Sequence, residues 1–267
     1  MILLPTILFF ILGLVIGSFL NVVIYRLNTS KSLGGRSACM SCRNKLSWYE
    51  LIPVFSFMGL MGRCRSCKTK ISIQYPLVEL ATGFMFAALF LKLSDHGAFM
   101  ITYLYYATAF SLLLVIAVYD LKHKIIPDML SLALGVMAFV GLFFFQNSIF
   151  YPHTPSLAEF LSGIWMALPF ALLWLVSLGR WIGLGDAKLM LGIGWLLGTS
   201  LALSGVTVAF WVGAVVGVTL VVLSRSKKIS GLGLSRGLKS EIPFAPFLVM
   251  GAFLAFICEF NFFLIQF

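Results

Sequence analysis

The segment Gly183–Lys188 reads Gly-Leu-Gly-Asp-Ala-Lys and separates two long apolar stretches of the chain. An ionisable residue at the edge of a membrane span is costly, so Asp186 indicates a functional site unless it only caps a helix or pairs with a nearby cation. Gly183 and Gly185 would allow close backbone approach and unusual dihedral angles beside Asp186. Lys188 is a candidate for tuning this carboxylate or for binding another carboxylate or a lipid headgroup.

The composition around this segment is that of an integral membrane protein. Of the 267 residues, 61% are hydrophobic and 10% are charged, and the mean hydropathy is +1.04. A soluble domain has roughly 25% charged residues. The apolar runs have the length of helices and lack the alternation of barrel strands, which predicts an all-α polytopic membrane protein.

Basic residues mark one side of the predicted bundle. Nine of the 19 Lys and Arg lie between Arg26 and Lys70, and most others fall in alternate later loops. This is the positive-inside pattern, so the net charge of +10 is explained by topology and headgroup contact and does not indicate nucleic-acid binding.

Hydropathy and charge together predict about eight spans with the N-terminus outside. The first span has no basic residue before it and no Ala-x-Ala-like cleavage site, so we expect a retained helix and not a removed signal peptide. The expected spans are 5–27, 75–93, 98–119, 125–145, 159–178, two short spans within 189–223 that turn near 199–200, and 243–263. Residues 1–27 form the first helix, 28–74 a cytoplasmic insert, and 75–267 the transmembrane core.

Asp120 supplies a second carboxylate at the depth of Asp186. Because one out-and-back pair of spans separates them, both are expected at the cytoplasmic edge of the membrane. Two carboxylates in a partly dry site cannot both ionise easily, which leaves one as an acid and the other as a base. Such a pair can activate water against a peptide carbonyl and protonate the leaving amine.

Two further carboxylates lie near the same edge. Asp128 follows Pro127 and would cap or kink the next span or join the pair. Glu79 lies about one turn into the second span, where it is either a buried hydrogen-bonded support for the bundle or part of the site.

The insert contains four of the five cysteines, as Cys39-x-x-Cys42 and Cys64-x-x-Cys67 with 21 residues between the pairs. Paired motifs of this kind surround one tetrahedral Zn²⁺ in ribbon-like domains, and four thiolates make the metal structural. Two disulfides are the competing interpretation, which a reducing cytoplasm disfavours. Cys258 in the last span is interpreted as a packing residue.

At these residues the chain resembles the bifunctional type IV prepilin peptidases, in which the aspartates belong to a Gly-x-Gly-Asp intramembrane aspartyl protease. The similar segments are 17–27 (GSFLNVVIYRL), 46–54 (LSWYELIPV), 62–67 (GRCRSC), 75–80 (YPLVEL) and the surroundings of Asp120 and Asp186. Met40 replaces the proline often found inside the first cysteine motif, which spares the ligands.

The resemblance implies both the reaction and its setting. Asp120 and Asp186 would cleave the basic leader of a prepilin or pseudopilin at the cytoplasmic face of the bacterial inner membrane. The enzyme would then methylate the new N-terminal residue with S-adenosylmethionine, although no soluble-type glycine fingerprint for that donor is present. The cysteine insert, absent from relatives that are only peptidases, suggests the second activity.

Two other classes of function compete with this one. An ion- or proton-coupled transporter could use Asp120, Asp186 and Glu79 as a relay, but transporter carboxylates usually lie near mid-bilayer in broken helices. No inverted repeat is visible in this sequence. A zinc-ribbon scaffold without chemistry would leave the aspartate pair and its glycines unexplained.

Overall fold

The computed structural model describes residues 2–29, 34–95, 97–146, 148–225, 243–260 and 262, with backbone alone at 223–225. Most of the predicted inner loop 224–241 and the end of the last predicted span lie outside these residues. In chain order the elements are α1 (Leu3–Arg26), the 3-10 helix η1 (Trp48–Leu51), α2 (Phe55–Gly59), α3 (Gln74–Leu93), α4 (Phe99–His123), α5 (Asp128–Gly141), β1 (Phe145–Gln146), β2 (Ile149–Phe150), α6 (Leu157–Ser177), α7 (Leu184–Arg225) and α8 (Ala245–Cys258).

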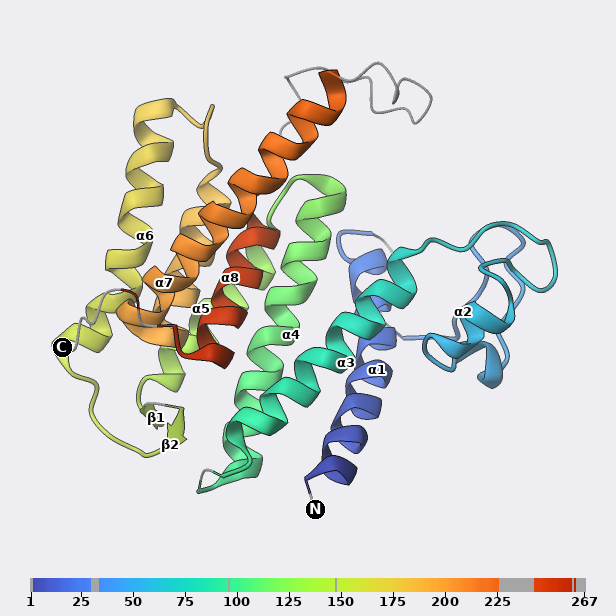
Figure 1. The fold of residues 1–267 in the computed structure, drawn as a ribbon, viewed down its shortest axis with the longest axis horizontal. Helices are drawn as coiled ribbons and strands as arrows, with labels where there is room; N and C mark the ends of the chain where they lie inside the picture. Colours follow the sequence, from blue (N-terminus) through green and yellow to red (C-terminus); the bar gives the residue numbers. More distant parts are fainter. Residues whose placement is uncertain are drawn as a thin grey trace. The chain divides into compact units, whose positions relative to one another are not determined.

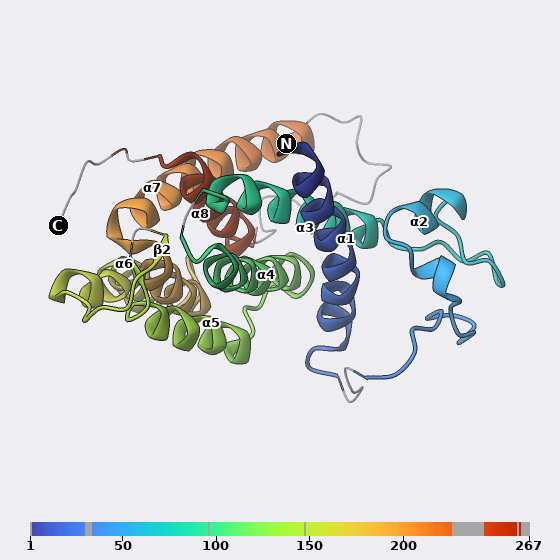
Figure 2. The same ribbon diagram turned by 90° about the horizontal axis from the view of Figure 1, so that it is seen from below.

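The chain divides into two compact units, and the division falls between Ser111 and Leu112 inside α4. In the first unit, α1 and α3 lie side by side (Figures 1 and 2). A Cβ atom at Gly17 would come within 2.8 Å of the Glu79 Cα atom, so glycine permits this close approach of the two helices. The insert with η1 and α2 connects α1 to α3.

The second unit contains α5 to α8, with α7 packed against α5, α6 and α8. Small residues bring these helices together: a Cβ atom at Gly194 of α7 would lie 2.7 Å from the Gly163 Cα atom of α6. The Ser162 hydroxyl donates a hydrogen bond of 3.0 Å to the Gly194 carbonyl across this contact. Polar groups in lipid need such internal partners, because the surrounding acyl chains offer none.

The long stretch after Asp186 is broken, as the sequence predicts. Gly198 has φ 74° and ψ 169°, which divides α7 into two helical segments one residue before the expected turn. Glycine adopts this left-handed φ without the clash that a Cβ atom would cause.

Five helices in the described part of the chain are long and apolar enough to cross a membrane, namely α1, α3, α4, α6 and α7, and α5 and α8 are shorter apolar helices. The all-α membrane architecture is confirmed, while the number of eight spans stays a prediction. One detail was not expected: β1 and β2 form a two-residue antiparallel hairpin after α5. Helix α5 begins after Pro127 and ends at Gly141, so it is shorter than the predicted span at 125–145.

Candidate active site and metal centre

Asp120 lies in the last turn of α4 and its side chain is buried, with 5% of the residue exposed. Its carboxylate accepts a hydrogen bond from the backbone N–H of Ala245, the first residue of α8. The first N–H groups of a helix have no partner within the helix and carry partial positive charge. The start of α8 therefore supplies a donor suited to a buried carboxylate.

Asp186 occupies the first turn of α7 and is 8% exposed. Its carboxylate accepts a hydrogen bond from the backbone N–H of Gly183, and its own N–H donates to the Gly183 carbonyl at 3.2 Å. The contact from the Gly183 N–H to the Asp186 carboxylate is one half of a capping box, with Gly183 as the N-cap. Asp186 therefore has the capping role that was one interpretation of its sequence position. This role leaves the Oδ1 atom of its carboxylate without a partner among the described residues.

Asp120 and Asp186 are both buried in the second unit, and the charge of Asp120 acts on the Asp186 carboxyl group. The Oδ1 atom of Asp186 is buried without a hydrogen-bond partner among the described residues. A buried carboxylate oxygen without a partner is expensive unless a proton, a water molecule or a ligand meets it. Two buried carboxyl groups in electrostatic contact, one with a free oxygen, are the arrangement that general acid–base chemistry on a bound water requires.

The two glycines before Asp186 have different structural roles. A Cβ atom at Gly185 would lie 2.9 Å from the Ile126 Cβ atom, so this glycine lets the α4–α5 turn approach the start of α7. At Gly183 the nearest atom would be an Asp186 oxygen at 3.7 Å, which is ordinary contact. Neither glycine has a positive φ. The expectation of close approach holds for Gly185, and that of unusual dihedral angles is wrong for both.

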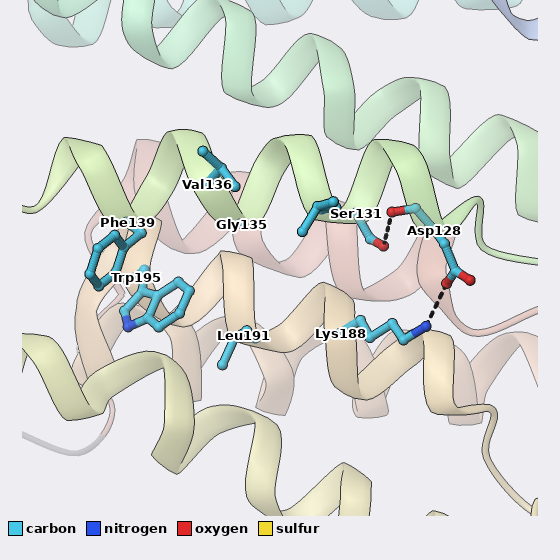
Figure 3. A pocket seen from close by; sticks show the side chains of 9 residues that line it. Asp128, Ser131, Gly135, Val136, Phe139, Lys188, Leu191 and Trp195 are labelled. Atoms are coloured by element: carbon cyan, nitrogen blue, oxygen red, sulfur yellow. Dashed lines mark hydrogen bonds and ion pairs between the residues drawn. The ribbon is translucent and has the colours of Figure 1, made fainter.

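Lys188 and Asp128 pair with each other and not with the buried aspartates. Lys188 Nζ lies 2.6 Å from Asp128 Oδ1, and the two side chains are 44% and 76% exposed. Figure 3 shows the pair at one end of a groove between α5 and α7, whose lining continues past Leu191 to Phe139 and Trp195. The groove has a volume of about 610 Å³. Asp128 thus pairs with Lys188, and a role of either residue in the reaction stays a prediction.

Glu79 lies in the first unit and is 7% exposed. Its Oε2 atom accepts a hydrogen bond of 2.8 Å from the backbone N–H of Val54, and its carboxylate also accepts one from the Ser18 hydroxyl. This geometry suits a support that ties the insert and α1 to α3. Its role in the reaction stays a prediction.

The four cysteines of the insert form a cluster that could hold a metal ion. The Sγ atoms of Cys39, Cys42, Cys64 and Cys67 all lie within 4.8 Å of one another, and no pair is bonded as a disulfide. Cys39 Sγ and Cys67 Sγ are 3.8 Å apart. Zn–S bonds of about 2.3 Å in a tetrahedron place sulfur atoms about 3.8 Å apart, so the residues fit such a centre.

Thr69 prepares one of these thiols for metal binding. Hydrogen bonds from the Thr69 hydroxyl and backbone N–H lower the pKa of Cys67 to about 6. The thiolate is the form that binds a metal, so at neutral pH Cys67 is already largely in the form that could act as a ligand.

Each cysteine pair sits in the same turn, a repeat that the spacing analysis missed. Arg43 and Lys68, each directly after the second cysteine of its pair, both have φ 58°. In each turn the backbone carbonyl of the first cysteine accepts a hydrogen bond from the N–H of this residue. Isolated antiparallel β-bridges close the two turns, at Ala38–Lys45 and Arg63–Lys70. The signal was present as a basic residue after each second cysteine.

Comparison with known proteins places these features in a family. Residues 11–93 match the model of the bacterial peptidase A24 N-terminal domain, and residues 107–218 match that of the type IV leader peptidase family. No solved structure is significantly similar to the chain.

Several curated relatives are named prepilin leader peptidase/N-methyltransferase, among them the following three. The protein of Burkholderia pseudomallei (strain 1026b) is 31% identical, over 90% of this chain and 81% of the relative. That of Bacillus subtilis (strain 168) is 30% identical, over 93% of this chain and 92% of the relative. That of Pseudomonas aeruginosa is 30% identical, over 92% of this chain and 87% of the relative. With both domain models and relatives matched along most of its length, the chain belongs to the type IV leader peptidase family.

Proposed function

We propose that this protein is a prepilin leader peptidase and N-methyltransferase of the bacterial inner membrane. The observation that carries the peptidase assignment is the buried pair of Asp120 and Asp186 with its unpartnered oxygen. Membership of the leader peptidase family and the names of the relatives support the proposed substrate class, a prepilin or pseudopilin.

The carboxylate pair carries out hydrolysis as one acid and one base. The ionised carboxylate removes a proton from a water molecule as that water attacks the scissile carbonyl, and the protonated one donates to the departing amine. The α8 N-terminus at Asp120 and the Gly183 N–H at Asp186 each offer a donor to the carboxylate that is ionised, against the cost of its burial.

The site is proposed to lie at the cytoplasmic face, with the N-terminus outside. The support is the distribution of basic residues, of which 18 of 19 fall on the inner side of the predicted map, with Lys92 as the exception. Alkaline phosphatase fused after Gly97 should be active, because it is exported there, and inactive when fused after Lys124. The reverse pattern would overturn the orientation.

Zn²⁺ is proposed as the resident metal of the cysteine cluster. Four thiolates leave no open coordination position, so the metal would stabilise the insert and not take part in hydrolysis. A polar insert of this size needs such a link to fold. S-adenosylmethionine is the proposed methyl donor, in keeping with the relatives' name as methyltransferases.

Mass spectrometry of the product tests both activities together. Purified protein in detergent is incubated with a prepilin, with and without S-adenosylmethionine. Both reactions should give a product without its leader, and only the reaction with donor should add the mass of one methyl group. A cleaved product that is never methylated would contradict the proposed methyltransferase activity. A prepilin or pseudopilin that stays intact would overturn the proposed peptidase activity.

A further inference from the structure

The insert exposes large apolar side chains beside a high positive charge. Trp48, Phe55, Met58 and Met61, here called the apolar patch, are 77%, 70%, 68% and 87% exposed. A soluble surface seldom gathers such side chains unless they contact a partner or a membrane.

The patch belongs to one small substructure. Phe55 and Met58 are three residues apart and so share one face of α2, which packs against η1, the helix of Trp48. The ring of Phe57 points elsewhere, because a Cβ atom at Gly62 would lie 3.0 Å from its Cζ atom. One face of α2 is therefore packed on the insert and the other is left open.

A hydrogen bond fixes α2 at the level where α3 enters the membrane. Val54, directly before α2, donates its N–H to Glu79 at 2.8 Å. Glu79 is five residues into α3, which is about 8 Å along the axis from the first residue of that helix. With α3 as a membrane span that begins at its first residue, the start of α2 would lie within the interfacial layer and not far out in the cytoplasm.

The charge of the insert indicates which kind of surface the apolar patch would contact. Residues 34–73 include seven basic residues and a single acidic one, Glu50. Even with a metal bound by four thiolates, whose complex is dianionic for Zn²⁺, the insert keeps a positive excess. The cytoplasmic leaflet has a negative surface potential that attracts such segments.

We propose that the apolar patch inserts into the interface of the surrounding bilayer, with the basic side chains of the insert on anionic headgroups. Amphipathic segments that combine Trp or Phe with Lys or Arg bind membranes in this way. Interfacial binding holds the metal-binding insert at the membrane surface. The inference depends on α1 and α3 crossing a membrane and is independent of the proposed catalytic activity.

Lipid quenching of Trp48 tests the proposal in the full-length protein. One copy is placed in each nanodisc, made of brominated phosphatidylcholine with or without phosphatidylglycerol. The Trp48 signal is the difference between the native protein and Trp48→Phe. At least half of this signal should be quenched in discs with phosphatidylglycerol, and at least twofold less should be quenched without it.

Matched variants distinguish the contribution of the apolar patch to the quenching from that of other exposed residues of the insert. Phe55→Ser with Met58→Ser should lower the quenching at least twofold. Met40→Ser, at a 63% exposed methionine outside the patch, should leave it unchanged. The metal-to-protein ratio of each variant verifies that the insert is folded.

Four outcomes would overturn the proposal. Trp48 could stay unquenched, or be quenched equally with and without phosphatidylglycerol. Its emission could change only when a disc holds two copies, which would assign the patch to a second chain. It could also change only when a prepilin is added, which would assign the patch to the substrate.

Discussion

At the scale of single residues, the site depends on what stands next to Asp186. Gly185 leaves room for Ile126, whose turn connects α4 to α5, and so allows the chain that follows Asp120 to approach the helix that begins before Asp186. Gly183 serves through its backbone, as the N-cap that hydrogen-bonds the Asp186 carboxylate. The Gly-x-Gly-Asp pattern thus combines a steric requirement with a capping one.

Substitution of the two glycines should separate these roles. Gly185→Ala places a methyl group 2.9 Å from the Ile126 Cβ atom and must displace the turn. Displacement of a catalytic group by about 1 Å can cost up to 10²-fold in rate, so we expect at least about a tenfold loss of prepilin cleavage. Gly183→Ala is the matched control and should retain cleavage within about threefold, since its methyl group meets ordinary contacts. Equal losses in initial-rate assays would contradict this division.

The turns of the cysteine cluster offer a second residue-level test. Lys68 has φ 58°, which a β-branched residue resists. Lys68→Val should destabilise the metal-bound insert by about 1–3 kcal/mol, whereas Lys68→Gly should be neutral or slightly stabilising. Lys70→Val, outside the left-handed region, is the control. The rate of metal release to a competing chelator reports the relative stability of these variants. Faster metal release from Lys68→Gly than from Lys68→Val would refute the strain argument.

The sequence predicted which residues are chemically important better than it predicted which residues contact one another. Asp120 and Asp186 were paired by topology alone, because a hairpin of spans returns the chain to the side it left. The partners of Lys188 and Asp128 were not predicted, since which face of a helix meets a neighbour depends on the packing angle between helices. The donor from Ala245 was also beyond reach, because it comes from a helix more than 100 residues away in sequence.

At the scale of elements, the ion pair of Lys188 and Asp128 joins the starts of α7 and α5 (Figure 3). Asp128 also lies in the first turn of α5, where negative charge is favourable. Exposed pairs typically contribute about 0.2–1 kcal/mol, so this contact orients the two helix ends more than it stabilises the fold.

Neutralising the pair should therefore have a small effect. Lys188→Met and Asp128→Asn should each lower the free energy of unfolding by about 1 kcal/mol or less, and the double charge swap should restore part of the loss. Cleavage should stay within a few-fold of the native rate, because neither residue belongs to the buried pair. A loss of cleavage as deep as that of a catalytic substitution would place Lys188 or Asp128 in the reacting site.

Element types were more predictable than element lengths. The break in α7 followed from a stretch too long for one span, and Gly198 supplies it. The early end of α5 and the hairpin of β1 and β2 did not follow, because apolarity continues through Phe143 and Phe144 and hides the end of the helix. Hydropathy reports which residues avoid water and gives little information on where a backbone leaves the helix.

At the scale of the whole molecule, the cysteine cluster and the carboxylate pair belong to different compact units. The cysteines lie in the unit that ends at Ser111, and Asp120 and Asp186 lie in the other. This division differs from the domains expected at 1–27, 28–74 and 75–267, which stay predictions.

Loss of the metal should consequently act on one unit. In Cys64→Ser with Cys67→Ser, bound metal should fall to near zero and amide hydrogen exchange should accelerate across residues 34–73. Exchange within α5 to α8 should stay unchanged, because those helices are held by their own packing. Equal acceleration in both units, measured by mass spectrometry in nanodiscs, would contradict independent units.

The central claim is that Asp120 and Asp186 together perform the hydrolysis, and initial rates of prepilin cleavage by purified variants test it most directly. Asp120→Asn and Asp186→Asn should each lower the rate by at least about 10³-fold, since either change removes the acid or the base, while helix content and metal content stay native. Asp128→Asn, an exposed aspartate paired with Lys188, should retain cleavage within a few-fold. Near-native cleavage by either buried-site variant would contradict the account.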